Sequence, residues 1–134
     1  MATWEDVSRI ALALPDTSMR STYGQMPAWR VHDRVFLWSR PMRETDLEEL
    51  GAAAPDGPAL GARVESLHAK EALLAAQPDV FFTTSHFDGH PTVLARVERL
   101  DVDDLEELAV EAWLARAPKR LASAWLATAG RAAR

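Results

Sequence analysis

Cysteine is absent from the 134-residue sequence, and this one absence excludes several kinds of site. A chain without cysteine has no disulfide framework, no thiol nucleophile, no cysteine-ligated zinc and no iron–sulfur cluster. Local catalytic signatures are missing as well, since the chain contains no G-x-S-x-G, no Walker A loop, no G-x-G-x-x-G and no H-E-x-x-H. The sequence therefore favours a non-catalytic protein and predicts no cofactor.

Long apolar runs are also missing. No stretch approaches the roughly 18 consecutive apolar residues of a membrane span. The residues Met1–Asp6 lack the basic and apolar regions of a signal peptide. We therefore expect a cytoplasmic protein with no membrane partner. The length and the 48% hydrophobic content fit one domain over residues 1–134, with a frayed tail at 130–134.

Lysine is scarce, and the charge is distributed unevenly. The net charge of −5 argues against a protein that coats nucleic acid indiscriminately. However, five arginines and one aspartate give +4 between Arg20 and Arg43, and five basic residues without an acid follow from Arg116 onward. The acids concentrate in 44–56 and 98–111. A locally basic region fits contact with phosphates, and solvated faces of an ordinary domain are the alternative.

Apolar residues recur at helical spacing in four segments. The pattern predicts helices over 4–13, 67–77 and 102–115, and a last helix from about Pro118 to Gly130. Thr3 is an expected N-cap that forms a capping box with Asp6, and Ser66 is an expected N-cap of the second helix.

Alternating segments between these helices predict an antiparallel sheet. Residues 28–32 and 35–39 read as a hairpin around Asp33-Arg34, residues 59–65 as a third strand, and residues 80–87 and 90–97 as a second hairpin around Asp88-Gly89. Pairing across the turns places Val80 opposite Val97 and Phe82 opposite Ala95. Pro91 argues against regular pairing near the second turn. In the first hairpin one buried face is expected to hold Trp29, Val31, Phe36 and Trp38.

The two remaining segments are predicted to be irregular. Residues 16–27 read as a loop that carries Tyr23-Gly24, and residues 40–58 as an irregular stretch with one short helical turn. The whole order predicts an α+β fold, in which an antiparallel sheet of about five strands has helices packed on one face. The other face and the hairpin tips would then be free to bind a partner. Their candidate nucleic-acid contacts are Arg30, His32, Arg34, His90, Arg96, Lys119 and Arg120.

His86, Asp88 and His90 form the most metal-like cluster in the sequence. Imidazoles with a carboxylate between them can bind zinc or iron. Their spacing falls across a glycine turn, so polar turn residues are the alternative, and we predict no metal site. Two acidic groups, at 46–49 and at 101–104, are interpreted as solvated surface because neither shows a sign of burial or a complete calcium loop.

Several motifs resemble the MmcQ/YjbR-like family. They are Ile10–Pro15, Met26–Val31, Val35-Phe36, Glu71–Pro78, Phe81–Pro91 and Ala112–Arg120, in the same order along most of the chain. The most specific is Phe81–Pro91, whose loop holds His86, Asp88, Gly89 and His90. The resemblance implies a frataxin-like (CyaY-like) α+β fold and a DNA-binding label that rests on analogy with a double-wing sheet. It implies no catalytic residue. The sequence departs from the family in a long 42–58 loop, in Ser85 and in a sparsely acidic first helix.

Two functional hypotheses follow from these observations. The first is a DNA-binding module that uses the basic sheet face and the hairpin tips. The second is a protein- or small-ligand-binding domain, in its simplest form a homodimer, that uses the same face through apolar surface at Val35, Leu37, Phe81 and Leu94. A metal-dependent enzyme or iron handler at His86 and His90 is a third reading.

Overall fold

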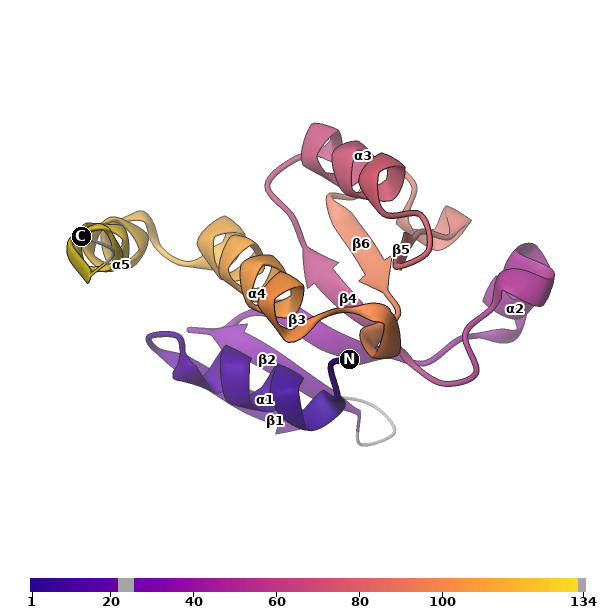
Figure 1. Cartoon of the computed structure of the whole chain (residues 1–134), viewed down its shortest axis with the longest axis horizontal. Helices are drawn as coiled ribbons and strands as arrows, with labels where there is room; N and C mark the ends of the chain where they lie inside the picture. Colours follow the sequence, from indigo (N-terminus) through magenta and orange to yellow (C-terminus); the bar gives the residue numbers. More distant parts are fainter. Residues whose placement is uncertain (22–25, 133–134) are drawn as a thin grey trace.

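The computed structural model describes residues 1–21 and 26–132. It contains one antiparallel six-stranded sheet in the order β1-β2-β3-β4-β6-β5, with the helices α1, α3 and α4 against one face (Figure 1). Helix α5 packs beside α4, where Trp125 contacts Trp113. The predicted α+β class is therefore confirmed. The elements are α1 Trp4–Ala13, β1 Thr17–Ser21, β2 Pro27–Val31, β3 Arg34–Arg40, α2 Glu44–Leu50, β4 Ala59–Arg63, α3 Leu67–Ala76, β5 Phe81–Phe82, β6 Thr92–Ala95, α4 Val102–Arg116 and α5 Lys119–Ala132, with single 3-10 turns at Gly51–Ala53, Ser85–Phe87 and Val97–Arg99.

The helices form where the sequence predicts them because caps and apolar periodicity agree. The Asp6 N–H donates to the Thr3 hydroxyl and the Thr3 N–H donates to the Asp6 carboxylate, which completes the predicted capping box. The Ser66 hydroxyl accepts from the Ala69 N–H at the start of α3. Helix α5 continues two residues past Gly130, where the sequence predicted its end. The last residues of the predicted tail, 133 and 134, lie outside the described residues.

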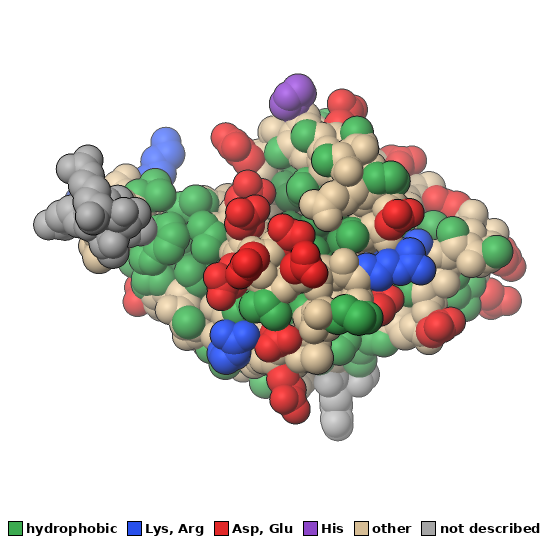
Figure 2. All heavy atoms as spheres, viewed as in Figure 1, with side chains coloured by type: hydrophobic (Ala, Val, Ile, Leu, Met, Phe, Trp, Pro, Cys, Tyr) green, Lys and Arg blue, Asp and Glu red, His purple; other side chains and the backbone are tan. Residues whose placement is uncertain are grey.

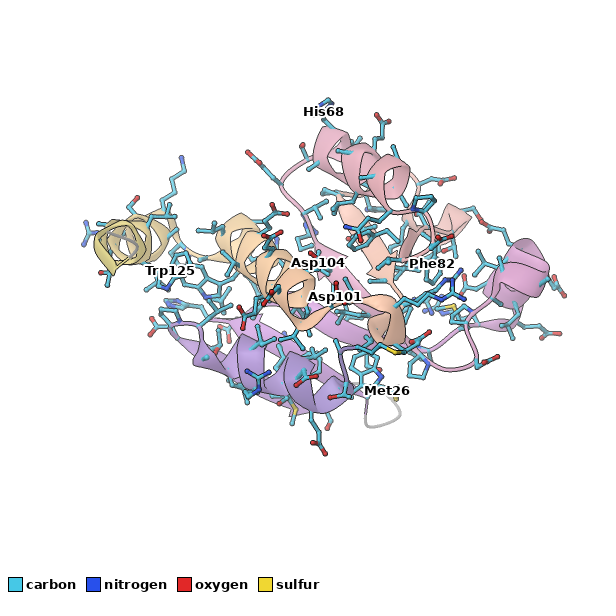
Figure 3. All side chains as sticks on the ribbon, in the orientation of Figure 1. Met26, His68, Phe82, Asp101, Asp104 and Trp125 are labelled. Atoms are coloured by element: carbon cyan, nitrogen blue, oxygen red, sulfur yellow. The ribbon has the colours of Figure 1, made fainter. Side chains whose placement is uncertain are left out.

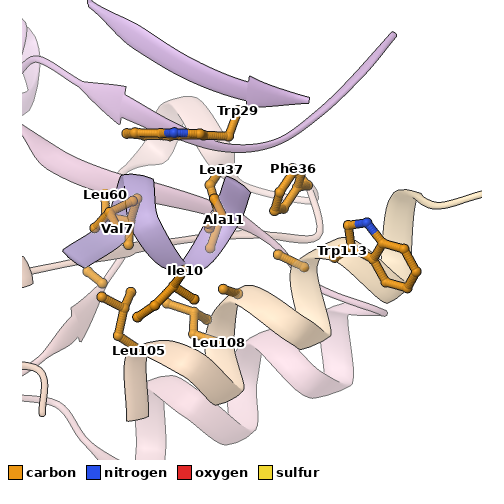
Figure 4. Close-up of a cluster of buried hydrophobic side chains, with 14 of the residues drawn as sticks. Val7, Ile10, Ala11, Trp29, Phe36, Leu37, Leu60, Leu105, Leu108 and Trp113 are labelled. Carbon is orange, nitrogen blue, oxygen red and sulfur yellow. The ribbon is translucent and has the colours of Figure 1, made fainter. Parts of the chain in front are cut away.

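The main core lies between the helices and one face of the sheet (Figure 4). Val7 and Ile10 of α1 and Leu105 and Leu108 of α4 are buried against Leu37 and other strand residues. Burial of each such side chain contributes about 1.5–3 kcal/mol relative to exposure. This burial holds α1 and α4 on the sheet and leaves the opposite sheet face to other elements.

Strand β1 was not predicted. The sequence reads as loop there because Thr17–Ser21 is polar, and four of its five residues are exposed at the edge of the sheet. It pairs with β2 from Thr17–Val31 to Ser21–Pro27. Backbone hydrogen bonds to β2 therefore form this strand without the apolar alternation on which the prediction depends. Tyr23 and Gly24 of the predicted loop lie outside the described residues.

A β-bulge at Phe36 overturns the predicted register of the first hairpin. Arg30 pairs with Val35 but Trp29 pairs with Leu37, so Phe36 is an extra residue on β3. The tight turn is His32-Asp33 instead of Asp33-Arg34, with His32 at a φ of 55°. Both Phe36 and Leu37 are consequently buried in the main core. After the bulge, the side chains of β3 alternate between the two sheet faces again, but shifted by one residue from the prediction. Trp38 therefore lies on the opposite face from Trp29.

The second hairpin is also shifted by one residue from its prediction. Phe81 pairs with Ala95 and Phe82 with Leu94, so Phe81 and not Phe82 faces the main core. Beyond Phe82 the chain leaves the ladder and forms the 3-10 turn Ser85–Phe87, in agreement with the expected effect of Pro91. Phe81, Leu94 and Leu37 are 4%, 1% and 0% exposed, so the apolar surface predicted at these three residues does not exist.

The second face of the sheet is covered at one end. A small cluster of Ala59, Phe82 and Leu94 lies there beneath Met42, Leu50 of α2 and Phe87. At the other end, over β2, β3 and the end of β4, the described residues form no comparable apolar cluster on this face. In the described part of the chain, no helix is both long and apolar enough to cross a bilayer.

Candidate functional site

A shallow groove occupies the open end of the second sheet face. It is lined by Ala28 of β2, Val35 and Trp38 of β3, Arg63 of β4 and Arg116 at the end of α4, and its volume is about 350 Å³. These residues are far apart in the sequence. The sheet order places β2, β3 and β4 side by side, and α4 packs against β3 and β4, which brings its last residue to the rim.

The floor of the groove is Trp38, which lies against Gly61. The two residues are ladder partners on β3 and β4. A Cβ atom on Gly61 would come within 2.3 Å of Trp38 Cε2, so only glycine leaves room for the indole ring at this position. Phe87 packs against the same ring, with the ring centroids 6.5 Å apart and the planes tilted by 49°. The indole is thus held flat on the sheet and half-buried.

Three arginines meet at the rim of the groove. The Arg34 guanidinium donates from Nη1 to the backbone carbonyl of Arg116 over 3.4 Å. Burial and the positive charges of Arg63 and Arg34 lower the pKa of Arg116 below its ordinary value. The lowered pKa reflects burial first and the two neighbouring positive charges second.

Arg30 adds a fourth guanidinium on the same face. It pairs with Val35 across the β2–β3 ladder, and its Nη1 donates to the carbonyl of Asp33 over 3.3 Å. The Nε atoms of both Arg30 and Arg116 are buried without a hydrogen-bond partner. Among the ion pairs between described residues, none joins Arg30, Arg34, Arg63 or Arg116 to a carboxylate. We call Arg30, Arg34, Arg63 and Arg116 the arginine rim.

Other sequence-predicted contacts lie at varying distances from this rim. Lys119 and Arg120 are exposed on the first turn of α5, and Lys119 is within about 11 Å of Arg116 along the chain. His32 is exposed at the hairpin turn, where its Nε2 lies 3.1 Å from Asp16 Oδ2. His90 is exposed in the family loop.

Arg96 is not part of this grouping. Arg96 directly follows β6, and its neighbours across the sheet lie near Ser39 of β3. Ser39 is roughly 13 Å along β3 from Val35, which is the ladder partner of Arg30. The side chain of Arg96 is buried, with Nη2 bonded to the Ala53 carbonyl and the guanidinium 4.4 Å from the centroid of Phe82. Burial and the neighbouring charge of Arg99 lower its pKa. The structure therefore gives Arg96 internal contacts in place of a position beside Arg30 and Arg34.

Internal contacts fix the loop 83–91, which carries the most specific family motif. Lys70 of α3 is 6% exposed and donates from Nζ to the carbonyls of Phe87 and His90, over 2.7 and 3.1 Å. Glu49 of α2 accepts from both the N–H and the hydroxyl of Ser85, at 2.9 and 2.6 Å. The loop therefore holds Phe87, and through Phe87 it supports Trp38.

The histidines of this loop do not converge. His86, Asp88 and His90 are all exposed, and His86 packs edge-on against Phe87 with the centroids 4.8 Å apart. Over residues 1–21 and 26–132, no group of three or more histidine and acidic side chains is placed to hold a metal ion. Gly89 occupies the tight turn at a φ of 76°, which favours glycine.

The two sides of the molecule differ in charge. Acidic side chains gather over α4 on the helix side (Figure 2), where Asp103, Glu106, Glu107 and Glu111 line a shallow depression. Asp101 and Asp104 lie near the start of α4 (Figure 3), where the helix dipole favours anions. The arginine rim lies on the sheet side. Further acids lie on α2, which covers the other end of the second sheet face, so the basic groove is a local feature of that face.

Two functional residues had no local signal in the sequence: Arg63, which ends a short strand, and Lys70, which sits within α3 as one of only two lysines. Arg116 begins the basic segment seen in the sequence, but nothing local places it near Arg30. The sequence predicts Trp38 on the buried face of the hairpin because it carries no signal for the bulge at Phe36. Only the antiparallel order of β2, β3 and β4 would have indicated that Arg63 and Arg116 lie near Arg30.

The fold defines an α+β sheet protein with a basic groove on its open face. The YjbR family profile matches residues 12–115. The chain belongs to the YjbR family, which confirms the resemblance found in its motifs. It is 47% identical over 133 residues to the uncharacterized proteins Rv2570 of Mycobacterium tuberculosis and Mb2600 of Mycobacterium bovis, with 97% of this chain and 100% of each relative covered.

A solved structure shares the fold. The crystal structure of Deinococcus radiodurans protein DR2400, a DUF419 domain, superposes with a TM-score of 0.63 at 18% identity, covering 85% of this chain and 78% of that chain. The likeness extends the α+β fold to a distant relative.

Proposed function

We propose that this protein is a non-catalytic DNA-binding module whose contact surface is the arginine rim. The observation that carries the proposal is a groove lined by Arg63 and Arg116, with Arg34 bonded to the Arg116 carbonyl. Arg30 lies on the same sheet face as the ladder partner of Val35, and within the described residues no carboxylate is paired to any of the four arginines. Unpaired arginines at this density repel one another, and phosphate oxygens are the acceptors that their fork geometry fits.

The charge asymmetry of the molecule supports the same function. A polyanion approaching the acidic α4 side is repelled, whereas the arginine side attracts it, so the field orients the protein on DNA. Contacts to phosphates position a protein without reading sequence. The proposed binding is therefore salt-dependent and largely independent of duplex sequence.

Fluorescence anisotropy with a labelled 16-base-pair duplex at 50 mM salt tests the proposal. The wild type is expected to bind in the micromolar range, and Arg30→Ala/Arg34→Ala to bind at least tenfold more weakly. A control with the same loss of charge, Arg9→Ala/Arg99→Ala, changes exposed arginines outside the rim and is expected to keep wild-type affinity. Absence of binding at 50 mM salt, or equal loss in both double variants, would contradict the proposal.

Binding of a protein or small ligand on the same face is a weaker alternative. Three of the four apolar residues that suggested it are buried, and only Val35 lines the groove.

A further inference from the structure

We propose that the groove takes one unpaired nucleobase, stacked on Trp38 and flanked by the arginine rim, so that the protein prefers single-stranded DNA over duplex. This inference rests on the proposed function and adds to it the form of the ligand. It starts from the position of Trp38, which the bulge at Phe36 removes from the main core and places on the open sheet face.

The indole is arranged as a platform. One side of the ring is occupied by Gly61, where a Cβ would overlap Cε2, and Phe87 packs against it at a tilt. The described ring contacts of Trp38 include only Phe87, and no arginine lies over its face as Arg40 lies over Phe87. The groove therefore presents an aromatic surface to solvent between charged walls.

The indole ring and the arginines beside it fit the two parts of a nucleotide, the base and the phosphate. Aromatic side chains on a sheet stack unpaired bases, and arginines beside them hold the phosphates. Arg63 and Arg116 line the groove together with Trp38, so a base on the indole would carry its phosphate to these guanidiniums. In a duplex the faces of the bases are covered by their neighbours, and a base must leave the stack before it can reach a platform of this kind.

The family loop acquires a role in this arrangement. Lys70 and Glu49 fix the backbone on either side of Phe87, and Phe87 supports the indole. The loop thus acts as a positioning element for Trp38, and none of its histidines needs to contact the ligand.

The test compares two pentamers with the same phosphates: five thymidines, and five abasic tetrahydrofuran residues. Binding at 20 mM salt is followed through tryptophan fluorescence and anisotropy. We expect the wild type to bind the thymidine strand at least tenfold more tightly, since stacking one base alone gives roughly 5- to 150-fold. Stacking is also expected to quench part of the intrinsic fluorescence.

Two variants locate the effect. Trp38→Phe should keep the preference for bases but lose most of the quenching, whereas Trp38→Leu should bind both pentamers equally. Trp125→Leu is the matched control on α5 (Figure 3), since Trp125 lines a different depression with Ile10 and Val110. Equal binding of the two pentamers by the wild type overturns the inference and leaves the proposed function standing, provided that binding weakens with salt. Absence of binding to the pentamers and to duplex overturns both.

Discussion

Trp38 lies so close to Gly61 that a single methyl group on the glycine would reach within 2.3 Å of the indole. The contact joins β3 to β4 on the face of the sheet that the main helices leave open. It fixes the orientation of the aromatic floor in the groove.

The first prediction concerns this contact. Gly61→Ala should destabilise the protein by about 1–3 kcal/mol, because either the indole or the strand must move. Urea unfolding measures the change. Gly57→Ala is the matched control, since a Cβ there meets nothing within 4 Å, and it should have little effect. Equal stability of the wild type and Gly61→Ala would show that the indole does not lie on the glycine.

The buried ion pair between Arg40 and Asp46 gives the second prediction. Their side chains are 8% and 4% exposed, and Nη2 lies 3.1 Å from Oδ2. The interpretation of residues 46–49 as solvated surface is therefore wrong for Asp46. Asp46→Ala should cost about 3–5 kcal/mol because it leaves a buried guanidinium without its counter-charge. Arg40→Met/Asp46→Leu should recover much of that loss. Glu48→Ala, on the exposed side of α2, serves as the control in the same denaturation series. A double variant less stable than Asp46→Ala would argue against this assignment.

Lys70 supports the third prediction. Lys70→Met should destabilise the protein by about 1–3 kcal/mol, because two loop carbonyls lose their shared donor. Hydrogen exchange should also accelerate at the backbone amides of the 83–91 loop. The exposed Lys119→Met provides the comparison. Unchanged exchange in the loop would mean that the ammonium does not hold it.

Glu111 gives a prediction about how the stability of the protein depends on pH. Burial, and then the charges of Glu107 and Glu65, raise its pKa above 4.5 in the folded protein. The folded state therefore binds more protons than the unfolded state, and this group lowers stability as the pH rises through the window above 4.5. Glu111→Gln should stabilise the protein at pH 7 by less than about 1 kcal/mol, since the side chain is exposed and screened.

Unfolding at pH 4 and at pH 7 checks this effect. The gain should be much smaller at pH 4, where Glu111 is mostly protonated in both states. Glu48→Gln controls for the change in net charge. A gain of equal size at both pH values would exclude the titration of Glu111 as its cause.

Much of the fold could be predicted because local signals agreed with tertiary packing. Helices α1 and α3 have side-chain caps, α4 has a stripe of buried apolar residues, and strand β4 alternates over Ala59–Arg63. The register of the two hairpins could not be predicted in the same way. The bulged residue Phe36 moves every later side chain of β3 to the opposite face of the sheet. The burial of Phe36 depends on α1 and α4, which are distant in sequence.

The site was predictable only in part, for a related reason. Arg30 and Arg34 stand in a visibly basic segment, so their charge could be recognised locally. Arg116 also begins a visibly basic segment, but the proximity of Arg63 and Arg116 to Arg30 and Arg34 depends on sheet order and helix packing, which no local pattern reports. Arg96 carries the same charge but is buried against Phe82. The sequence alone does not distinguish a buried arginine of this kind from an arginine at the groove.

The salt dependence of DNA affinity tests the central claim most directly. The slope of log K against log salt should fall in magnitude by nearly 1 for each phosphate contact removed. Arg63→Gln/Arg116→Gln should therefore reduce the slope by about 2, while Arg9→Gln/Arg99→Gln should leave it unchanged. Equal slopes for the wild type and Arg63→Gln/Arg116→Gln, measured on folded protein, would contradict a role for the arginine rim in binding phosphates.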